Sequence, residues 1–149
     1  MSFRKEHKLI IKKNNLPYFL NWLYENGGEK IYPNRIISST YFDNKKFQSF
    51  FDSEEGLLPR KKIRLRSYCF QEHHNTNSKL EIKISSFEGR YKTVNQIKNS
   101  IKLQKNGFFD NSYGICMPTS RVTYNRSYFY LSNYRVTIDE NIFYSFPGS

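Results

Sequence analysis

Charged and apolar residues alternate along several short segments of this chain, and this pattern most constrains its fold. Residues 62–66 (Lys-Ile-Arg-Leu-Arg) carry a basic side chain at every second position, and residues 80–84 (Leu-Glu-Ile-Lys-Ile) repeat the alternation. Because successive side chains of a β-strand point to opposite faces, each segment has one charged and one apolar face. The pattern predicts a sheet with one face packed on a core and the other lined with charge.

The same period-2 pattern, with Ile, Val, Thr, Tyr and Phe enriched, extends to other parts of the chain. It predicts strands at 3–11, 35–42, 61–70, 78–86, 120–130 and 134–139. A polar loop is expected over 71–77. Because strand pairs are joined by short loops, the chain is expected to be an α+β domain with an antiparallel sheet.

Three segments carry helix signals. Asn15 and Pro17 suit the start of a helix over Leu16–Glu25, which Gly27 and Gly28 would end. A second helix is expected over Asn44–Phe51. A third is expected over Val94–Lys105, with Val94, Ile97 and Ile101 facing the core.

Composition limits the possible partners. The 149 residues suit a single domain spanning 1–149, and 24 Lys and Arg against 13 Asp and Glu give a net charge of +11. An excess of positive charge indicates an anionic partner. No apolar run approaches the ~20 residues of a membrane helix. Two cysteines and no apolar leader segment make a cytoplasmic location the expectation.

Basic residues recur on the charged faces of several predicted strands, and this recurrence points to a built site. A charged face on one strand is usually just solvated. Several such faces can instead be gathered by closing the sheet around an anion. Arginine suits such a site because its planar guanidinium binds two phosphate oxygens at once, whereas lysine acts as a point charge.

Six segments, in this order, resemble the VTC domain, the polyphosphate polymerase branch of the triphosphate tunnel (CYTH-like) superfamily. The resemblance extends over about residues 3–144. The segments are 4–8 (Arg-Lys-Glu-His-Lys), 39–43 (Ser-Thr-Tyr-Phe-Asp), 64–68 (Arg-Leu-Arg-Ser-Tyr), 80–83 (Leu-Glu-Ile-Lys), 124–126 (Tyr-Asn-Arg) and 135–139 (Arg-Val-Thr-Ile-Asp).

The resemblance implies an antiparallel β-tunnel of eight strands with helices outside, in which basic residues bind a triphosphate or polyphosphate and Mn²⁺ or Mg²⁺ assists. By position, it assigns catalytic roles to Lys8, Arg64, Arg66, Lys83, Arg126 and Arg135. Substrate contacts are expected from Lys62, Arg90 and Lys92. The expected metal ligands are Glu6 and Glu81, because these cations prefer carboxylate oxygens.

Two departures from the family pattern bear on activity. The related triphosphatases open with Glu-x-Glu-x-Lys, whereas this chain has Arg4 at the first of these positions, which favours the VTC branch. Family members continue beyond the position of Ser149 into a strand with a metal-binding Glu and a further Lys. The tunnel is therefore expected to be incomplete, closed by a missing C-terminal segment or by a partner chain.

Three classes of function remain open at this stage. The first is a polyphosphate polymerase that transfers the terminal phosphoryl group of a nucleoside triphosphate onto polyphosphate, with an inorganic triphosphatase as a variant. The second is a remnant that binds polyphosphate or triphosphate without turnover. The third, suggested by charge and aromatic content alone, is a nucleic-acid binder.

Overall fold

A computed structural model describes residues 5–70 and 73–147, except for the side chains of residues 69–77. These residues form one antiparallel sheet in the order β4-β3-β2-β1-β6-β5, with β7 paired to the rest of β6. The strands are β1 (Glu29–Asp43), β2 (Arg60–Phe70), β3 (His73–Ser86), β4 (Gly89–Gln96), β5 (Phe108–Asp110), β6 (Gly114–Leu131) and β7 (Tyr134–Ser145).

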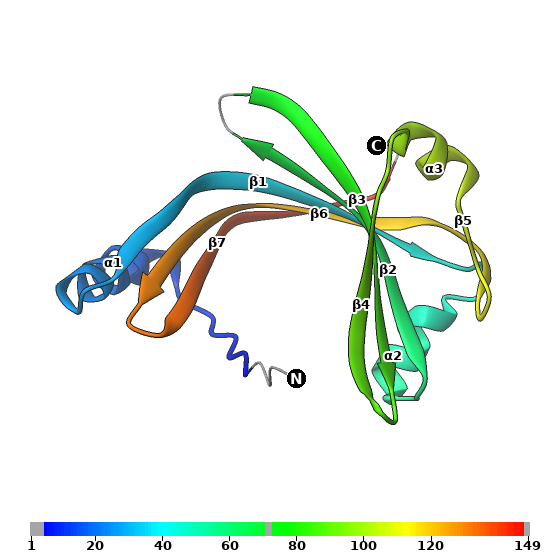
Figure 1. Cartoon of the computed structure of the whole chain (residues 1–149), viewed down its shortest axis with the longest axis horizontal. Coiled ribbons are helices and arrows are strands. Elements are labelled where there is room, and N and C mark those ends of the chain that lie inside the picture. The colour runs from blue at the N-terminus through cyan, green and yellow to red at the C-terminus, as the bar shows by residue number, and fades with distance from the viewer. Residues whose placement is uncertain (1–4, 71–72, 148–149) are drawn as a thin grey trace.

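The sheet curls strongly, so that β2, β3 and β4 stand across the direction of β1, β6 and β7 (Figure 1). Helices α2 (Gln48–Glu55) and α3 (Ser100–Asn106) lie on the outer side of this curl, and α1 (Leu16–Glu25) lies at the far end of β1, β6 and β7. The expected α+β class and antiparallel sheet are confirmed. The described strands form a half-barrel rather than a closed tunnel.

The apolar faces of the central strands pack on the convex side of the sheet. Ile63, Leu65 and Leu80 are each at most 4% exposed. They form one cluster with Phe42 and Cys116, and partly buried residues of α3, β5 and neighbouring segments cover it. The alternation read from residues 62–66 and 80–84 therefore predicts the orientation of β2 and β3 correctly.

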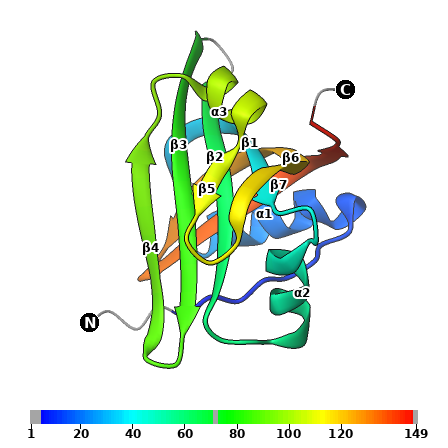
Figure 2. The same ribbon diagram turned by 90° about the vertical axis from the view of Figure 1, so that its right-hand side faces the viewer.

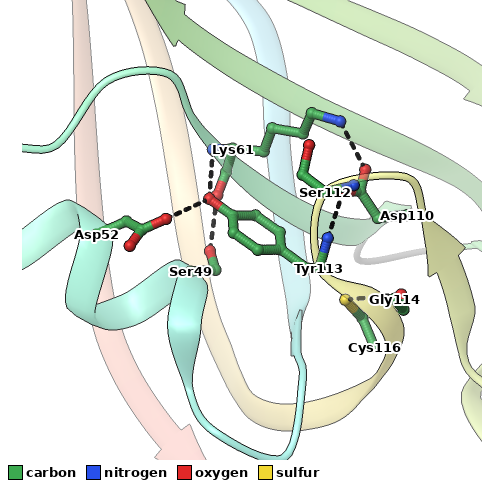
Figure 3. A network of polar contacts seen from close by, with 8 residues as sticks. All are labelled: Ser49, Asp52, Lys61, Asp110, Ser112, Tyr113, Gly114 and Cys116. Carbon is green, nitrogen blue, oxygen red and sulfur yellow. Dashed lines mark hydrogen bonds and ion pairs between the residues drawn. The ribbon is translucent and has the colours of Figure 1, made fainter.

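A polar network fastens the outer elements to β2 (Figure 3). The Tyr113 hydroxyl donates to a carboxylate oxygen of Asp52 in α2 at 3.0 Å and accepts the backbone N–H of Lys61 at 3.1 Å. The Lys61 ammonium reaches Asp110 of β5 at 2.9 Å. Burial and the neighbouring carboxylates raise the pKa of Tyr113 to about 12. The polar groups on the convex side of β2 thus stabilise the fold by joining α2, β2 and β5.

The strand expected at 3–11 is wrong for the described residues 5–11. They form no strand, and Leu9 and Ile10 are 83% and 101% exposed. A strand needs a neighbour to satisfy its backbone groups, and the local alternation supplies none. The segment instead crosses the concave side of the curl, from α1 towards β4 (Figure 2).

The second helix begins later than expected, at Gln48 rather than Asn44. The reason is a cap built on Asp43, whose carboxylate accepts the backbone N–H groups of Ser49 and Phe50 at 3.0 Å each. Phe47 precedes the helix with a left-handed backbone, at φ 53°. Residues 44–47, which were expected to be the first turn of the helix, therefore form a turn that precedes it.

The helix expected over Val94–Lys105 is wrong in its first half. Val94 belongs to β4, which pairs with β3 through the turn before Gly89, and α3 starts only at Ser100 after a cap by Asn99. Ile97 does pack against the core, but Ile101 is 78% exposed. The loop expected over 71–77 is also too long, because β3 begins at His73.

Candidate functional site: the basic concave face

Strand register gathers the predicted basic residues on one surface, which we call the concave face. Residues directly opposite in an antiparallel pair share a face. Arg64 is opposite both Tyr41 and Glu81, and Lys83 is opposite both Lys62 and Lys92. The pairings place the following residues on this face: Arg35, Ser39, Tyr41, Lys62, Arg64, Arg66, Tyr68, Lys79, Glu81, Lys83, Arg90, Lys92, Tyr124 and Arg126.

Glu81 is the buried anion of the concave face. It is 2% exposed, and its Oε2 accepts from Arg64 Nε at 2.7 Å while Oε1 lies 3.6 Å from the Lys92 ammonium. Burial by itself would raise the pKa of Glu81, but Arg64, with Arg66 and Lys92, outweighs it and lowers the pKa. Glu81 is therefore a charged carboxylate held among cations.

Positive charge exceeds negative charge around this pair. Burial and then the repulsion from Arg64, Arg66 and Lys92 lower the pKa of Lys83, with Glu6 acting weakly in the opposite direction. Among the described residues, no acidic side chain forms an ion pair with Lys62, Arg66 or Lys83. The surface is thus poised to gain stability from an added anion.

Arg66 is held in place by neutral partners. Its Nε donates to the Ser39 hydroxyl at 3.2 Å, and a terminal nitrogen donates to the Tyr124 hydroxyl at 3.4 Å. These contacts orient the guanidinium without neutralising it. Arg66 is therefore a pre-positioned cation, the kind of group that binds a phosphate oxygen pair.

The two later arginines differ from each other. Arg126 makes a two-bond contact with Asp139 at 2.6 and 2.9 Å and lies 5.2 Å from the Tyr124 ring centroid. Its bonds to Asp139 raise the pKa of Arg126. Arg135 is exposed and lies 5.9 Å from the Tyr128 ring centroid. Arg126 is thus already paired, whereas Arg135 keeps its charge available.

The predicted residues of the first segment lie outside the sheet. Glu6 and Lys8 are exposed in the irregular segment that crosses the concave side, and Glu6 is close enough to act on the charge of Lys83. Arg90 is exposed near the start of the edge strand β4. The structure therefore brings together Lys62, Arg64, Arg66, Glu81, Lys83 and Lys92, with Arg90, Arg126 and Arg135 towards its margins.

Comparison with known families decides the affiliation of the chain. A family model described as the VTC domain matches residues 3–109. The match covers more than half of the 149 residues. This chain belongs to the VTC domain family. A search of the curated proteins finds no match. The VTC domain is a polyphosphate-related family within the CYTH-like superfamily, and a curled antiparallel half-barrel is consistent with that placement.

The matched region of the VTC domain contains most of the concave site but not all of it. It includes β1 to β4, and with them the cluster around Arg64 and Glu81. Arg126 and Arg135 lie beyond it, in β6 and β7. Their roles therefore depend on the two short segments 124–126 and 135–139 and on their place in the fold.

Sequence reasoning missed a second cationic cluster of this VTC domain. The Arg35 guanidinium lies 4.7 Å from the Tyr128 ring centroid and 5.1 Å from that of Tyr68, and its Nε donates to the Tyr128 hydroxyl at 3.0 Å. Lys79 lies 5.9 Å from the Tyr68 ring centroid. Arg35 lies an even number of residues from Ser39 and Tyr41 on β1, so its side chain points to the same face. This spacing is the sequence feature that could have assigned Arg35 to the site.

The expected metal site does not fit the donors that the described residues provide. Both oxygens of Glu81 are engaged by Arg64 and Lys92, so a cation there would have to displace two charged partners. Within the described ranges, no three His, Cys, Asp or Glu side chains lie together as a metal site requires. We therefore derive no step through a metal ion.

None of the described helices has the length and apolar character needed to cross a bilayer.

Proposed function

We propose that the concave face binds linear polyphosphate and the terminal phosphates of a nucleoside triphosphate, and that phosphoryl transfer onto polyphosphate takes place there. The observation that carries this proposal is the excess of cations beside Glu81. Arg66 and Lys83 form no ion pair with an acidic side chain in the described residues, and the charges of Arg64 and Arg66 both act on Lys83. A row of phosphates supplies the anions that this face lacks.

Electrostatics gives the binding step its driving force. Two like charges about 4 Å apart repel by about 1 kcal/mol in bulk water and more near a protein surface. A bound polyanion converts this repulsion among Arg64, Arg66 and Lys83 into attraction. Arg66 loses little freedom on binding, because Ser39 and Tyr124 already orient it.

The same residues suit the transfer step. Phosphoryl transfer depends largely on positioning and on stabilising charge that develops on the phosphoryl oxygens. In our proposal Arg64 and Arg66 hold those oxygens, and Lys83 and Lys62 contact the adjoining phosphates. Glu81 acts as a positioning residue, because its bond to Arg64 fixes the direction of that guanidinium.

The decisive experiment measures binding and turnover together. Polyphosphate binding is measured by calorimetry, and ATP with Mn²⁺ or Mg²⁺ is then supplied while polyphosphate growth and free phosphate are followed. Arg66→Ala combined with Lys83→Ala is expected to weaken polyphosphate binding at least tenfold. Lys45→Ala combined with Lys46→Ala is the matched control, because it removes two exposed cations from the turn before α2. Equal binding by both variants would overturn the proposed site.

A second candidate function is binding without turnover. It is favoured by the surroundings of Glu81, whose Oε2 is bonded to Arg64 and whose Oε1 lies 3.6 Å from the Lys92 ammonium, so that a metal ion there would meet two cations. Tight binding with neither polyphosphate growth nor phosphate release would establish this function in place of transfer. Phosphate release alone would indicate a triphosphatase. Preference for single-stranded RNA over polyphosphate at equal phosphate concentration would indicate a nucleic-acid binder instead.

A further inference from the structure

The half-barrel has two open edges. In the described part of the chain, β4 pairs only with β3 at one edge, and β7, together with the short β5, pairs only with β6 at the other. Tyr91 of β4 is 58% exposed, and Phe143 and Tyr144 of β7 are 65% and 72% exposed. Unpaired strand edges present rows of free backbone donors and acceptors, which bind a further strand readily. Both edges are thus suited to pairing.

Strand direction allows the edge of one copy to pair with the edge of another. The path β4-β3-β2-β1-β6-β7 contains five successive antiparallel pairings, so β4 and β7 run in opposite directions. Within one copy β4 and β7 cross at a large angle (Figure 1), so a two-fold axis inclined equally to both strands would place β4 of one copy antiparallel to β7 of the second. The symmetry then forms the second junction identically, and the ring of strands closes without leftover edges.

The charges of the two edge strands complement each other. β4 carries Arg90 and Lys92, whereas β7 carries Glu140 and Asp139, the latter already bonded to Arg126 of β6, beside one arginine. Opposite charges on neighbouring strands stabilise a pairing, and like charges oppose it. Pairing β4 with β7 is therefore favoured over pairing either edge with its own equivalent.

The concave faces impose a condition on such a dimer. Closing the ring turns two basic surfaces towards one enclosed space, and the excess charge around Lys83 would then be doubled. Repulsion at short range grows as water is excluded. An enclosed polyanion removes this penalty, because both faces bind it.

We propose that two copies of this chain close edge to edge, β4 to β7, around one linear polyphosphate chain. The inference rests on the proposed function, since it requires that the concave face binds polyphosphate. It adds to the proposed function a partner, which is a second copy of this chain, and the condition that this copy binds only when polyphosphate is present. The polyphosphate chain is both the ligand and the link that makes the dimer stable.

The test measures mass and binding on the same samples. The probe is a polyphosphate of defined length that spans the roughly 20 Å from Tyr41 to Arg35, at a strand rise of ~3.3 Å per residue. Light scattering is expected to show a monomer alone, a dimer at one chain per two proteins, and monomers again with excess chain. Binding with the mass of a monomer throughout would overturn the dimer and leave the proposed function intact. Absence of binding would overturn both, and a dimer without polyphosphate would overturn the anion requirement.

Edge variants separate pairing from binding. Register places Tyr91 and Phe143 on the convex side, so lysines there stay off the concave face. Tyr91→Lys with Phe143→Lys is expected to reduce the dimer fraction at least tenfold. Tyr18→Lys with Phe50→Lys is the matched control, since both rings are exposed, at 76% and 56%, and lie on helices α1 and α2 rather than on an edge strand. With excess polyphosphate, which keeps both variants monomeric, their affinities for the chain are expected to agree within twofold. Equal dimer fractions at one chain per two proteins would overturn the proposal.

Cross-linking identifies the strands that meet. Chains labelled with ¹⁴N and ¹⁵N are mixed with half an equivalent of polyphosphate and treated with a carbodiimide, which joins lysine amines to carboxylates. Mixed-isotope links from Lys92 or Lys98 to Asp139 or Glu140 are expected. Mixed-isotope links that join other pairs and never β4 to β7 would overturn the proposed arrangement.

Discussion

The two faces of β2 both carry lysine side chains, but only the lysine on the convex face has an acidic partner among the described residues. Lys61 points to the convex side, where its ammonium lies 2.9 Å from Asp110 inside a network that includes Tyr113. Lys62 points to the concave side, opposite Lys83 and without an acidic partner in the described residues. The charge of Lys61 is balanced by Asp110 within the protein. The charge of Lys62 has no such balance in the described part of the chain, and in our proposal the bound anion supplies it.

Buried carboxylates mark this difference. Asp110 on the convex side is 4% exposed and accepts the Lys61 ammonium and two backbone N–H groups. Glu81 on the concave side is 2% exposed and faces Arg64, Arg66 and Lys92. One anion closes a structural network, while the other is outnumbered by the cations around it. The balanced charges around Asp110 hold the fold together, and the excess of positive charge around Glu81 is where we propose that an anion binds.

The largest expected effect comes from breaking the convex core. Leu65→Ala removes a side chain that is 2% exposed and belongs to the central cluster. The free energy of unfolding is expected to fall by about 3 kcal/mol, because a cavity replaces packed methyl groups. Urea unfolding measures the loss. Polyphosphate affinity of the folded fraction should stay unchanged, and a selective loss of affinity would contradict the separation of the two faces.

Replacing the buried carboxylate of each face separately tests the difference between the concave and convex faces, and Glu81 is the one on the concave face. Glu81→Gln leaves Arg64 without its buried counter-charge, which is expected to lower stability by about 3 kcal/mol. The same change increases the net positive charge of the concave face, so polyphosphate affinity at low salt is expected to rise. Stability is measured by urea unfolding and affinity by calorimetry.

Asp110→Asn is the matched control on the convex side. It breaks the ion pair with Lys61 and is expected to lower stability by roughly 1–2 kcal/mol, because a buried polar group loses part of its bonding. Polyphosphate affinity is expected to stay within twofold of the parent. An equal rise in affinity for both variants would show that total charge, rather than the concave face, governs binding.

The pH dependence of stability follows from the lowered pKa of Glu81. Its pKa in the folded state lies below the ordinary value of 4.5, so unfolding takes up a proton in the window between the two values. The stabilisation by Glu81 is therefore fully present above that window and is lost as the pH falls through it. The stability gap between the parent and Glu81→Gln should narrow from pH 7 to pH 3. A gap of constant size would contradict this assignment.

A smaller effect is expected at Lys83. Its lowered pKa means that the free protein gains stability as the pH rises towards the ordinary value of 10.5, since the unfolded chain then holds more protons. Lys83→Met should remove that rise and slightly stabilise the free protein at pH 7. Polyphosphate affinity should fall roughly fivefold, as expected for one lost charge-assisted contact. Thermal unfolding and calorimetry check both, and lower stability would contradict the account.

Local parity explains what the sequence predicts well. The alternation in 62–66 and 80–84 determines which side chains of β2 and β3 share a face, because strand geometry has a fixed period of two. The VTC resemblance follows from six segments in order, of which 64–68 and 80–83 are two, and the antiparallel α+β class follows from alternating segments joined by short loops. These features depend on neighbours in sequence.

Pairing between distant segments explains what the sequence does not predict. Arg35 meets Tyr128 across β1 and β6, where the register shifts near Arg35, and no local pattern encodes that shift. Residues 5–11 alternate like a strand but have no partner strand in the described structure. Val94 joins β4 because β3 offers an edge, which overrides its helical spacing with Ile97. The same limit applies to Glu81, whose engagement with Arg64 and Lys92 depends on register.

An NMR titration of arginine side chains with polyphosphate tests the central claim most directly. The Nε–H signals of Arg64 and Arg66 report on the concave face, and that of Arg121, which donates to the Thr40 hydroxyl at 3.2 Å on the convex side, is the internal reference. The account predicts that the Arg64 and Arg66 signals shift on adding polyphosphate while the Arg121 signal stays in place. Equal shifts of all three signals, or a shift of Arg121 alone, would contradict it.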